Sequence, residues 1–231
     1  MQRFKTLLLV LLLPAIAMAQ EVQSPNGNVR LRFSLTGNGV PTYEMTYKNK
    51  AVVKPSHLGL ELAKDKHASK GMNETSLMDG FTIIDTKTSS FDETWRPVWG
   101  ETSTIRNNYT ELAVNLAQPA TKRNIIVRFR VYDYGMGLRY EFPQQDSLTY
   151  FVIKDEHTQF AMAGDHTAWW LPGDYDTQEQ KTQESRLSEI RSRFHDAVNW
   201  NNSSVAVFSP TGVQTALQMK TNDGLYLNIH E

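Results

Sequence analysis

Three carboxylates lie close together behind a pair of tryptophans, and this stretch is the part of the chain best suited to chemistry. Asp174, Asp176 and Glu179 fall within six positions, and they follow a Pro-Gly turn that comes after Trp169 and Trp170. Calcium prefers several oxygen ligands, which clustered carboxylates supply. Aromatic faces beside carboxylates also suit sugars, because the C–H faces of a sugar stack on rings while its hydroxyls form hydrogen bonds. The stretch is therefore a candidate cation or sugar site.

The same residues also have ordinary structural interpretations. Adjacent tryptophans point to opposite sides of a strand, so at least one of the pair is expected in the core. Asp174 and Asp176 are common turn residues, and Glu179 could simply favour the start of a helix. The ligand spacing of an EF-hand calcium loop is absent. From the residues alone, the functional and structural interpretations both stay open.

Other kinds of site find little support in the sequence. The chain has no cysteine, which excludes disulfides, thiolate nucleophiles and iron–sulfur clusters. Its six histidines do not fall into a metal-binding spacing such as HExxH, and no GxSxG, Walker or GxGxxG motif occurs. The 24 basic and 25 acidic residues are intermixed rather than gathered in a stripe, so no binding to nucleic acid is expected.

Alternating strands dominate the elements that must position these residues. Val127, Phe129 and Val131 point to one side while Arg128 and Arg130 point to the other, which is typical of a half-buried strand. About a dozen such short strands, separated by turns, predict an all-β antiparallel sandwich rather than βαβ units. Only residues 178–198 show helical spacing of apolar side chains. We expect one short helical segment in an otherwise all-β chain of 231 residues.

A second aromatic and acidic stretch, residues 91–101, contains Trp95 and Trp99. A sugar cleft or a loop that faces a partner would have this composition. The interpretation we favour is a loop that folds over the sandwich, with Trp95 or Trp99 as its anchor.

The N-terminus has the features of an export signal. Arg3 and Lys5 precede an apolar run from Leu7 to Leu13, and Ala17-Met18-Ala19 supplies a small-x-small cleavage pattern. The run is shorter than the roughly 20 residues that span a bilayer, so no membrane span is expected. We expect residues 1–19 to be removed as a signal peptide and residues 20–231 to fold outside the cytoplasm.

Six segments together resemble the N-terminal part of glycoside hydrolase family 97, the secreted α-glucosidases and α-galactosidases of Gram-negative polysaccharide-degrading bacteria. Within the family, the sequence is most similar to α-glucosidases of starch utilisation. The segments are residues 24–27 (SPNG), 91–100 (FDETWRPVWG), 139–145 (RYEFPQQ), 172–179 (PGDYDTQE), 209–216 (SPTGVQTA) and 223–226 (DGLY).

The resemblance implies an N-terminal β-super-sandwich, then a (β/α)8 catalytic barrel and a small C-terminal β domain. In the calcium-dependent members of the family, the ion lies in the active site, and the N-terminal domain lends it one glutamate. That glutamate ends the stretch that matches residues 174–179, so the resemblance implies Glu179 as a calcium ligand. The catalytic acid and base belong to the barrel, so the resemblance assigns no catalytic residue to this chain.

We therefore expect residues 20–231 to be one β-sandwich domain, truncated before the barrel and inactive alone. Its partners would be the catalytic barrel and, through that barrel, α-glucan oligosaccharides in the Gram-negative periplasm. Cleavage of α-glucosides or α-galactosides, with inversion or retention, stays open. One alternative is a free-standing carbohydrate-binding module that uses Trp95, Trp99, Trp169 or Trp170. Another is an interaction module with an exposed apolar patch.

Overall fold

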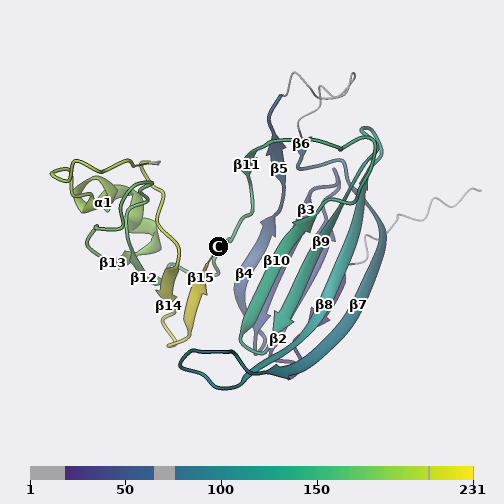
Figure 1. Ribbon diagram of the computed structural model, residues 1–231, viewed down its shortest axis with the longest axis horizontal. Helices are drawn as coiled ribbons and strands as arrows, with labels where there is room; N and C mark the ends of the chain where they lie inside the picture. The colour runs from purple at the N-terminus through teal and green to yellow at the C-terminus, as the bar shows by residue number, and fades with distance from the viewer. Residues whose placement is uncertain (1–18, 65–75, 208, 231) are drawn as a thin grey trace, which may run out of the picture. The chain divides into compact units, whose positions relative to one another are not determined.

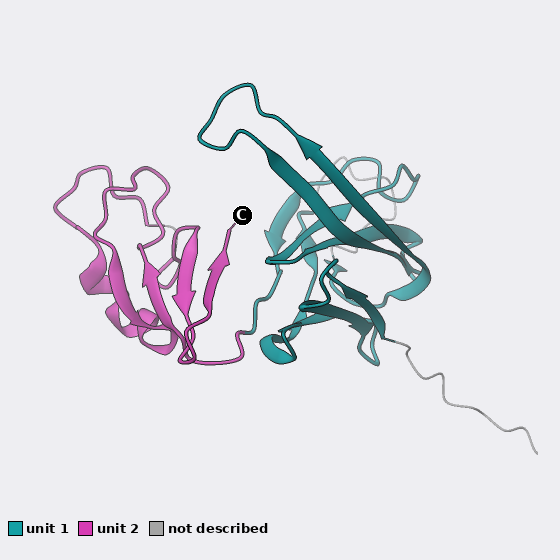
Figure 2. Ribbon diagram, turned by 90° about the horizontal axis from the view of Figure 1, so that it is seen from below, with its two compact units in different colours: residues 1–161 teal, residues 162–231 magenta. Residues whose placement is uncertain are grey.

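The computed structural model describes residues 19–64, 76–207 and 209–230. These residues are mostly β, with one short α-helix, as the sequence predicts. The expected signal peptide lies almost entirely outside them. The chain divides into two compact units, residues 1–161 and residues 162–231 (Figure 2). Within the described residues, no helix is both long and apolar enough to cross a membrane.

The first sheet of unit 1 is an antiparallel meander in which each strand pairs with the next along the chain (Figure 1). It consists of β1 (Gln20–Gln23), β2 (Val29–Leu35), β3 (Pro41–Tyr47) and β4 (Lys50–His57). The turn between β3 and β4 has positive φ at both Lys48 and Asn49. Positive φ at both central residues is the geometry that matches the twist of a two-residue hairpin.

The second sheet of unit 1 is also antiparallel, in the order β10-β9-β8-β7. It consists of β7 (Thr82–Trp95), β8 (Ile105–Gln118), β9 (Arg123–Tyr132) and β10 (Gly135–Glu141). Alternate side chains such as Leu112 and Phe129 are buried. The Phe129 ring lies 6.0 Å from both Phe33 and Tyr43 of the first sheet, so the two sheets enclose one core. This arrangement is the predicted sandwich.

A small third sheet, in the order β11-β5-β6, completes unit 1. It consists of β5 (Leu60–Leu62), β6 (Ser76–Leu77) and β11 (Ile153–Glu156). Tyr140 connects this region to β10, because its hydroxyl accepts from the amide of Gly59 at 3.1 Å and lies 2.9 Å from Thr158 Oγ1. Burial raises the pKa of Tyr140 to about 12, so the phenol stays protonated.

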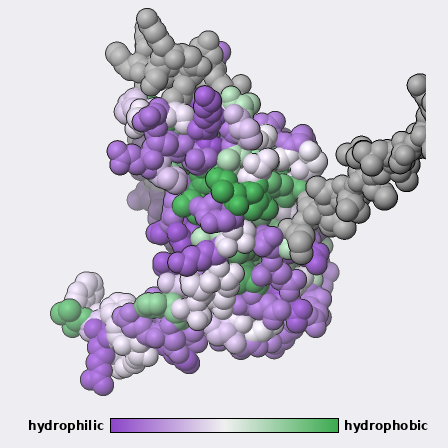
Figure 3. All heavy atoms as spheres, turned by 90° about the vertical axis from the view of Figure 1, so that its right-hand side faces the viewer, coloured by the Kyte–Doolittle hydropathy of each residue, from purple (hydrophilic) through white to green (hydrophobic). Residues whose placement is uncertain are grey.

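On the side of unit 1 that Figure 3 shows, hydrophobic side chains gather in one area, and hydrophilic surface surrounds it.

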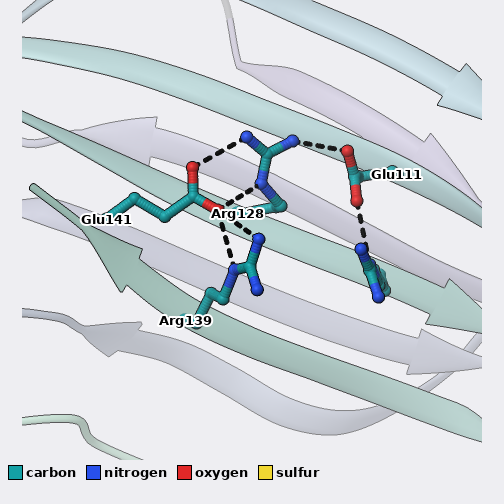
Figure 4. Close-up of polar contacts among 5 residues, drawn as sticks. Glu111, Arg128, Arg139 and Glu141 are labelled. Carbon is teal, nitrogen blue, oxygen red and sulfur yellow. Dashed lines mark hydrogen bonds and ion pairs between the residues drawn. The ribbon is translucent and has the colours of Figure 1, made fainter. Parts of the chain in front are cut away.

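An ionic network links β8, β9 and β10 on the face opposite the core (Figure 4). Arg128 donates to Glu141 at 2.7 Å and 2.8 Å and also donates to Glu111. Arg130 donates to Glu111, and Arg139 donates to Glu141. The Arg128 hydrogen bonds lower the pKa of Glu141 to about 2. The network therefore cross-links these three strands with charges that persist at neutral pH.

Unit 2 is a four-stranded antiparallel sheet with one face covered by α1. Its elements are β12 (Thr167–Trp170), β13 (Gln183–Arg186), the 3-10 helix η1 (Leu187–Glu189), α1 (Ile190–Ala197), β14 (Leu217–Lys220) and β15 (Tyr226–Ile229). Trp170 stacks on Phe194 of α1, with centroids 6.4 Å apart and an interplanar angle of 10°.

The predicted helix over residues 178–198 is wrong in its first half. Residues 183–186 form β13 and pair with β12 instead. The helical turn begins at Leu187, where the Glu189 carboxylate accepts from the Arg186 amide at 2.9 Å. The apolar residues that suggested a helix, from Leu187 onward, lie in η1 and α1 or just beyond, whereas the polar first half had no apolar face to pack.

Candidate functional site

The acidic stretch forms the loop between β12 and β13. Its backbone lies along a second segment of unit 2, residues 206–207 and 209–213. Isolated bridges join Pro172 to Val213 and Asp174 to Val207. The Gly173 amide donates to Gly212 at 2.7 Å, and the Tyr175 amide donates to Ala206 at 3.0 Å. Backbone pairing therefore fixes the first half of the loop.

Asp174 is the structural centre of the loop. Its Oδ1 accepts from the amides of Asp176 and Ala206, both at 3.0 Å, and its Oδ2 accepts from Gln180 Nε2 at 3.1 Å. Desolvation raises the pKa of Asp174, but these donors together outweigh it, and the pKa lies below its usual range. The carboxylate is thus ionised and already used to hold the loop. This agrees with its interpretation as a turn residue.

The second half of the loop is held from both sides of Glu179. Gln180 is buried, and its Oε1 accepts from the Asn199 amide at 2.9 Å. Thr177 Oγ1 accepts from the Glu179 amide at 3.0 Å, and the Thr177 carbonyl accepts from Gln214 Nε2 at 3.1 Å. The backbone position of Glu179 is therefore set by neighbours whose hydrogen bonds do not involve its carboxylate.

The Glu179 carboxylate itself is exposed. Asn202 Nδ2 donates to its Oε2 at 3.4 Å, and no ion pair engages it among the described residues. An exposed carboxylate can give one or two oxygens to a hard cation, whereas calcium takes six to eight. Glu179 alone is too little for a calcium site, but it is free to complete a site whose other ligands lie elsewhere. Asp176 is exposed in the same loop.

The two tryptophans have different environments, as strand alternation predicts. Trp170 is 1% exposed, and its Nε1 donates to Ser185 Oγ at 3.0 Å inside the core of unit 2. Trp169 points to the other face, where its Nε1 donates to Glu184 at 3.1 Å and its ring stacks near Tyr226. Trp170 therefore cannot contact a sugar.

A second cluster of possible metal ligands lies in unit 1. Glu61, Asp155 and His157 each place one ligand atom within 4.8 Å of the others. Lys154 Nζ lies 2.6 Å from Glu61 and lowers the pKa of that carboxyl. Lys154 would therefore compete with a metal ion for Glu61. Spacing in the sequence did not suggest it, because Glu61 comes from β5 and the other two residues lie in or next to β11.

The stretch over residues 91–101 does not fold over the sandwich, so the predicted anchor role of its tryptophans is wrong. Trp99 is 88% exposed and Trp95 is 45% exposed. The strands β7 and β8 continue past their neighbours and carry the loop away from the core.

Comparisons with known proteins give one family model and several similar solved structures. The family model described as glycosyl-hydrolase 97 N-terminal matches residues 22–231. A glycoside hydrolase family 97 enzyme from Pseudoalteromonas sp. strain K8, solved with acarbose, is similar with a TM-score of 0.71 and 29% identity. A variant of a family 97 enzyme from that strain, solved with panose, is similar with a TM-score of 0.70 and 28% identity.

Both matches cover 90% of this chain but only 27% of the solved chains, so the chain spans about a quarter of the length of these enzymes. A β-arabinopyranosidase structure is similar in fold, with a TM-score of 0.66 at 17% identity, and the match covers 90% of this chain and 31% of the β-arabinopyranosidase chain.

Proposed function

Because the chain belongs to glycoside hydrolase family 97, as the N-terminal region of such an enzyme, we propose that it docks on a catalytic barrel and lends Glu179 to calcium. The observation that supports this proposal is the pattern of hydrogen bonds in the loop between β12 and β13. Asp174 and Gln180 hold the backbone on either side, while the Glu179 carboxylate stays exposed. A carboxylate that completes a metal site shared with another domain must have a fixed backbone and must be accessible to the ion.

Calcium bound there would act as a Lewis acid that stabilises charge developing at the reacting oxygens. The part played by this chain is positional. Thr177 and Gln180 fix the backbone around Glu179, and Asn202 restrains one carboxylate oxygen while the other is free. Glycoside hydrolysis also needs two carboxyl groups, about 5–9.5 Å apart across the bond. Those groups would come from the barrel, so we propose that this chain is inactive alone.

The proposed activity is that of an α-glucosidase, with α-glucan oligosaccharides as substrates. This rests on the family and on the panose and acarbose found with the similar solved enzymes. We also propose that residues 1–19 direct export to the periplasm, which the charged start, apolar run and cleavage pattern support.

A calcium titration of the complete enzyme tests the role of Glu179. The variant Glu179→Gln keeps the side-chain shape and removes the charge, and we expect it to lower activity and raise the calcium concentration for half-maximal activity at least tenfold. Asp176→Asn removes another exposed charge from the same loop and should leave the titration near that of the unaltered enzyme. Titration curves for Glu179→Gln and Asp176→Asn that coincide with the unaltered one would refute the ligand role.

The free-standing carbohydrate-binding module makes a different prediction. This chain alone would bind maltooligosaccharides in calorimetry, through Trp95, Trp99 or Trp169, since Trp170 is buried. Heat at millimolar sugar that disappears in Trp99→Ala would favour that module over the docking domain.

A further inference from the structure

The hairpin of β7 and β8 continues past the rest of its sheet. Strand β9 pairs with β8 only from Thr110 onward, whereas β7 and β8 pair with each other from Trp95 and Ile105. The outer half of the hairpin is thus a two-stranded ribbon that ends in a loop over residues 96–104 and projects from unit 1 (Figure 2). We call residues 91–109 the arm. Two-stranded ribbons are marginally stable in water without further support.

Side chains within the arm hold its ribbon together. Arg106 makes a two-pronged ion pair with Asp92, through Nε at 2.8 Å and Nη2 at 2.6 Å. Phe91 stacks on Tyr109 with centroids 5.3 Å apart, and Tyr109 lies 5.3 Å from Tyr132 of β9. The ion pair and the ring contacts connect the arm to the sheet, so the loop is carried on a braced support.

The loop at the end of the arm exposes the apolar side chains that would normally be buried. Val98 is 100% exposed and Trp99 is 88% exposed. Tryptophan is enriched among the residues that dominate protein interfaces, where it fills a pocket on the partner. Arg106 and Asp92 neutralise each other in their ion pair. The other charged residues of the arm are two acidic side chains, Glu93 and Glu101, and one basic side chain, Arg96, so the end of the arm is acidic.

We propose that the arm is the element by which this chain docks on its catalytic domain, with Val98 and Trp99 inserted into an apolar pocket that has a basic rim. The inference rests on the proposed function and names the surface through which it is exercised. In the similar solved enzymes about three-quarters of the chain lies outside the matched region, which supports a partner domain on the same polypeptide as this one.

Other occupants fit the arm less well. Two copies of the arm in a symmetric contact would bring like charges together at the tip, which opposes association. A sugar usually binds in a concave site that buries most of its surface, whereas Val98 and Trp99 are almost fully exposed at the end of a projecting loop.

Hydroxyl-radical footprinting read by mass spectrometry measures the exposure of Trp99 directly. We expect the oxidation rate of Trp99 to be at least tenfold lower in the complete enzyme than in the 231-residue chain. Tyr134 serves as the control, because it is 83% exposed in the same unit but lies outside the arm. Its rate should change less than twofold. A Trp99 rate that is equal in both proteins would overturn the inference, as would protection in the chain alone that grows with protein concentration.

A pair of variants separates docking from a local effect. Trp99→Ala and Tyr134→Ala should both leave the melting temperature of the 231-residue chain unchanged, because neither side chain is buried there. In the complete enzyme, Trp99→Ala alone should split one cooperative melting transition into two. Identical melting of both variants in the enzyme would count against the arm. The calcium titration of Glu179→Gln is independent of this result, so each proposal can fail without the other.

Discussion

Replacing Trp170 by alanine should destabilise unit 2 more than any other single change in the acidic stretch. The side chain is 1% exposed, lies parallel to Phe194 at 6.4 Å and donates to Ser185 at 3.0 Å. Deleting a buried tryptophan costs about 3–5 kcal/mol. The lost hydrogen bond adds about 1 kcal/mol, which brings the expected loss to about 4–6 kcal/mol. Trp170→Phe keeps an aromatic ring and should cost about 1–2 kcal/mol, mainly for the hydrogen bond.

Trp169→Ala is the matched control, because the residue is adjacent but points to the other face of the sheet. It loses the ring contact with Tyr226, which is worth about 0.5–1.5 kcal/mol, and the exposed hydrogen bond to Glu184, which is worth about 1 kcal/mol at most. Amide hydrogen exchange of β12, β14 and α1, read as the free energy of opening, measures both variants in unit 2 itself. An equal or larger loss for Trp169→Ala would refute the assignment of Trp170 to the core.

Three further predictions follow from charges and hydrogen bonds. The pKa of Glu141 is about 2 in the folded chain and 4.5 without partners, so its contribution to the free energy of unfolding is present above pH 4.5 and is lost as the pH falls towards 2. In Glu141→Gln, the free energy of unfolding should lack this decrease between pH 4.5 and pH 2. Burial lowers the pKa of His166, so the folded state disfavours its charged form, and the free energy of unfolding should decrease as the pH falls below 6.5; His166→Gln should remove that dependence, and an unchanged pH profile would contradict it. Asp174→Ala removes the acceptor of three backbone amides and of Gln180, so limited proteolysis within residues 175–181 should become at least tenfold faster while the circular dichroism of the sheets is retained. Equal cleavage rates would show that Asp174 does not hold the loop.

The strands could be predicted from the sequence because burial follows alternation closely. Val127 and Phe129 are buried on β9, whereas Arg128 and Arg130 lie on the outer face, as their spacing indicates. Alternation also predicted that one of the adjacent tryptophans is buried. Local patterns were enough for these features because a strand of period two presents its faces without reference to the rest of the fold.

Features that depend on register between distant strands could not be predicted in this way. The network of Glu111, Arg128 and Glu141 needs three strands in one alignment. The exposure of Trp99 follows from the pairing of β9 with β8 stopping at Thr110, whereas β8 begins at Ile105 and pairs there with β7 alone. At the candidate site, the turn role of Asp174 was one of the interpretations that the sequence left open. The role of Glu179 as a ligand came only from resemblance to the family, because a single exposed carboxylate has no spacing signal of its own.

Calorimetric titration of calcium into the complete enzyme is the most direct test of whether Glu179 is a calcium ligand. We expect one calcium ion to bind, with an affinity at least tenfold weaker in Glu179→Gln than in Asp176→Asn, and no binding at submillimolar calcium in the 231-residue chain alone. Equal affinities in the two variants, or tight binding by the isolated chain, would contradict a calcium site completed between this region and a catalytic barrel.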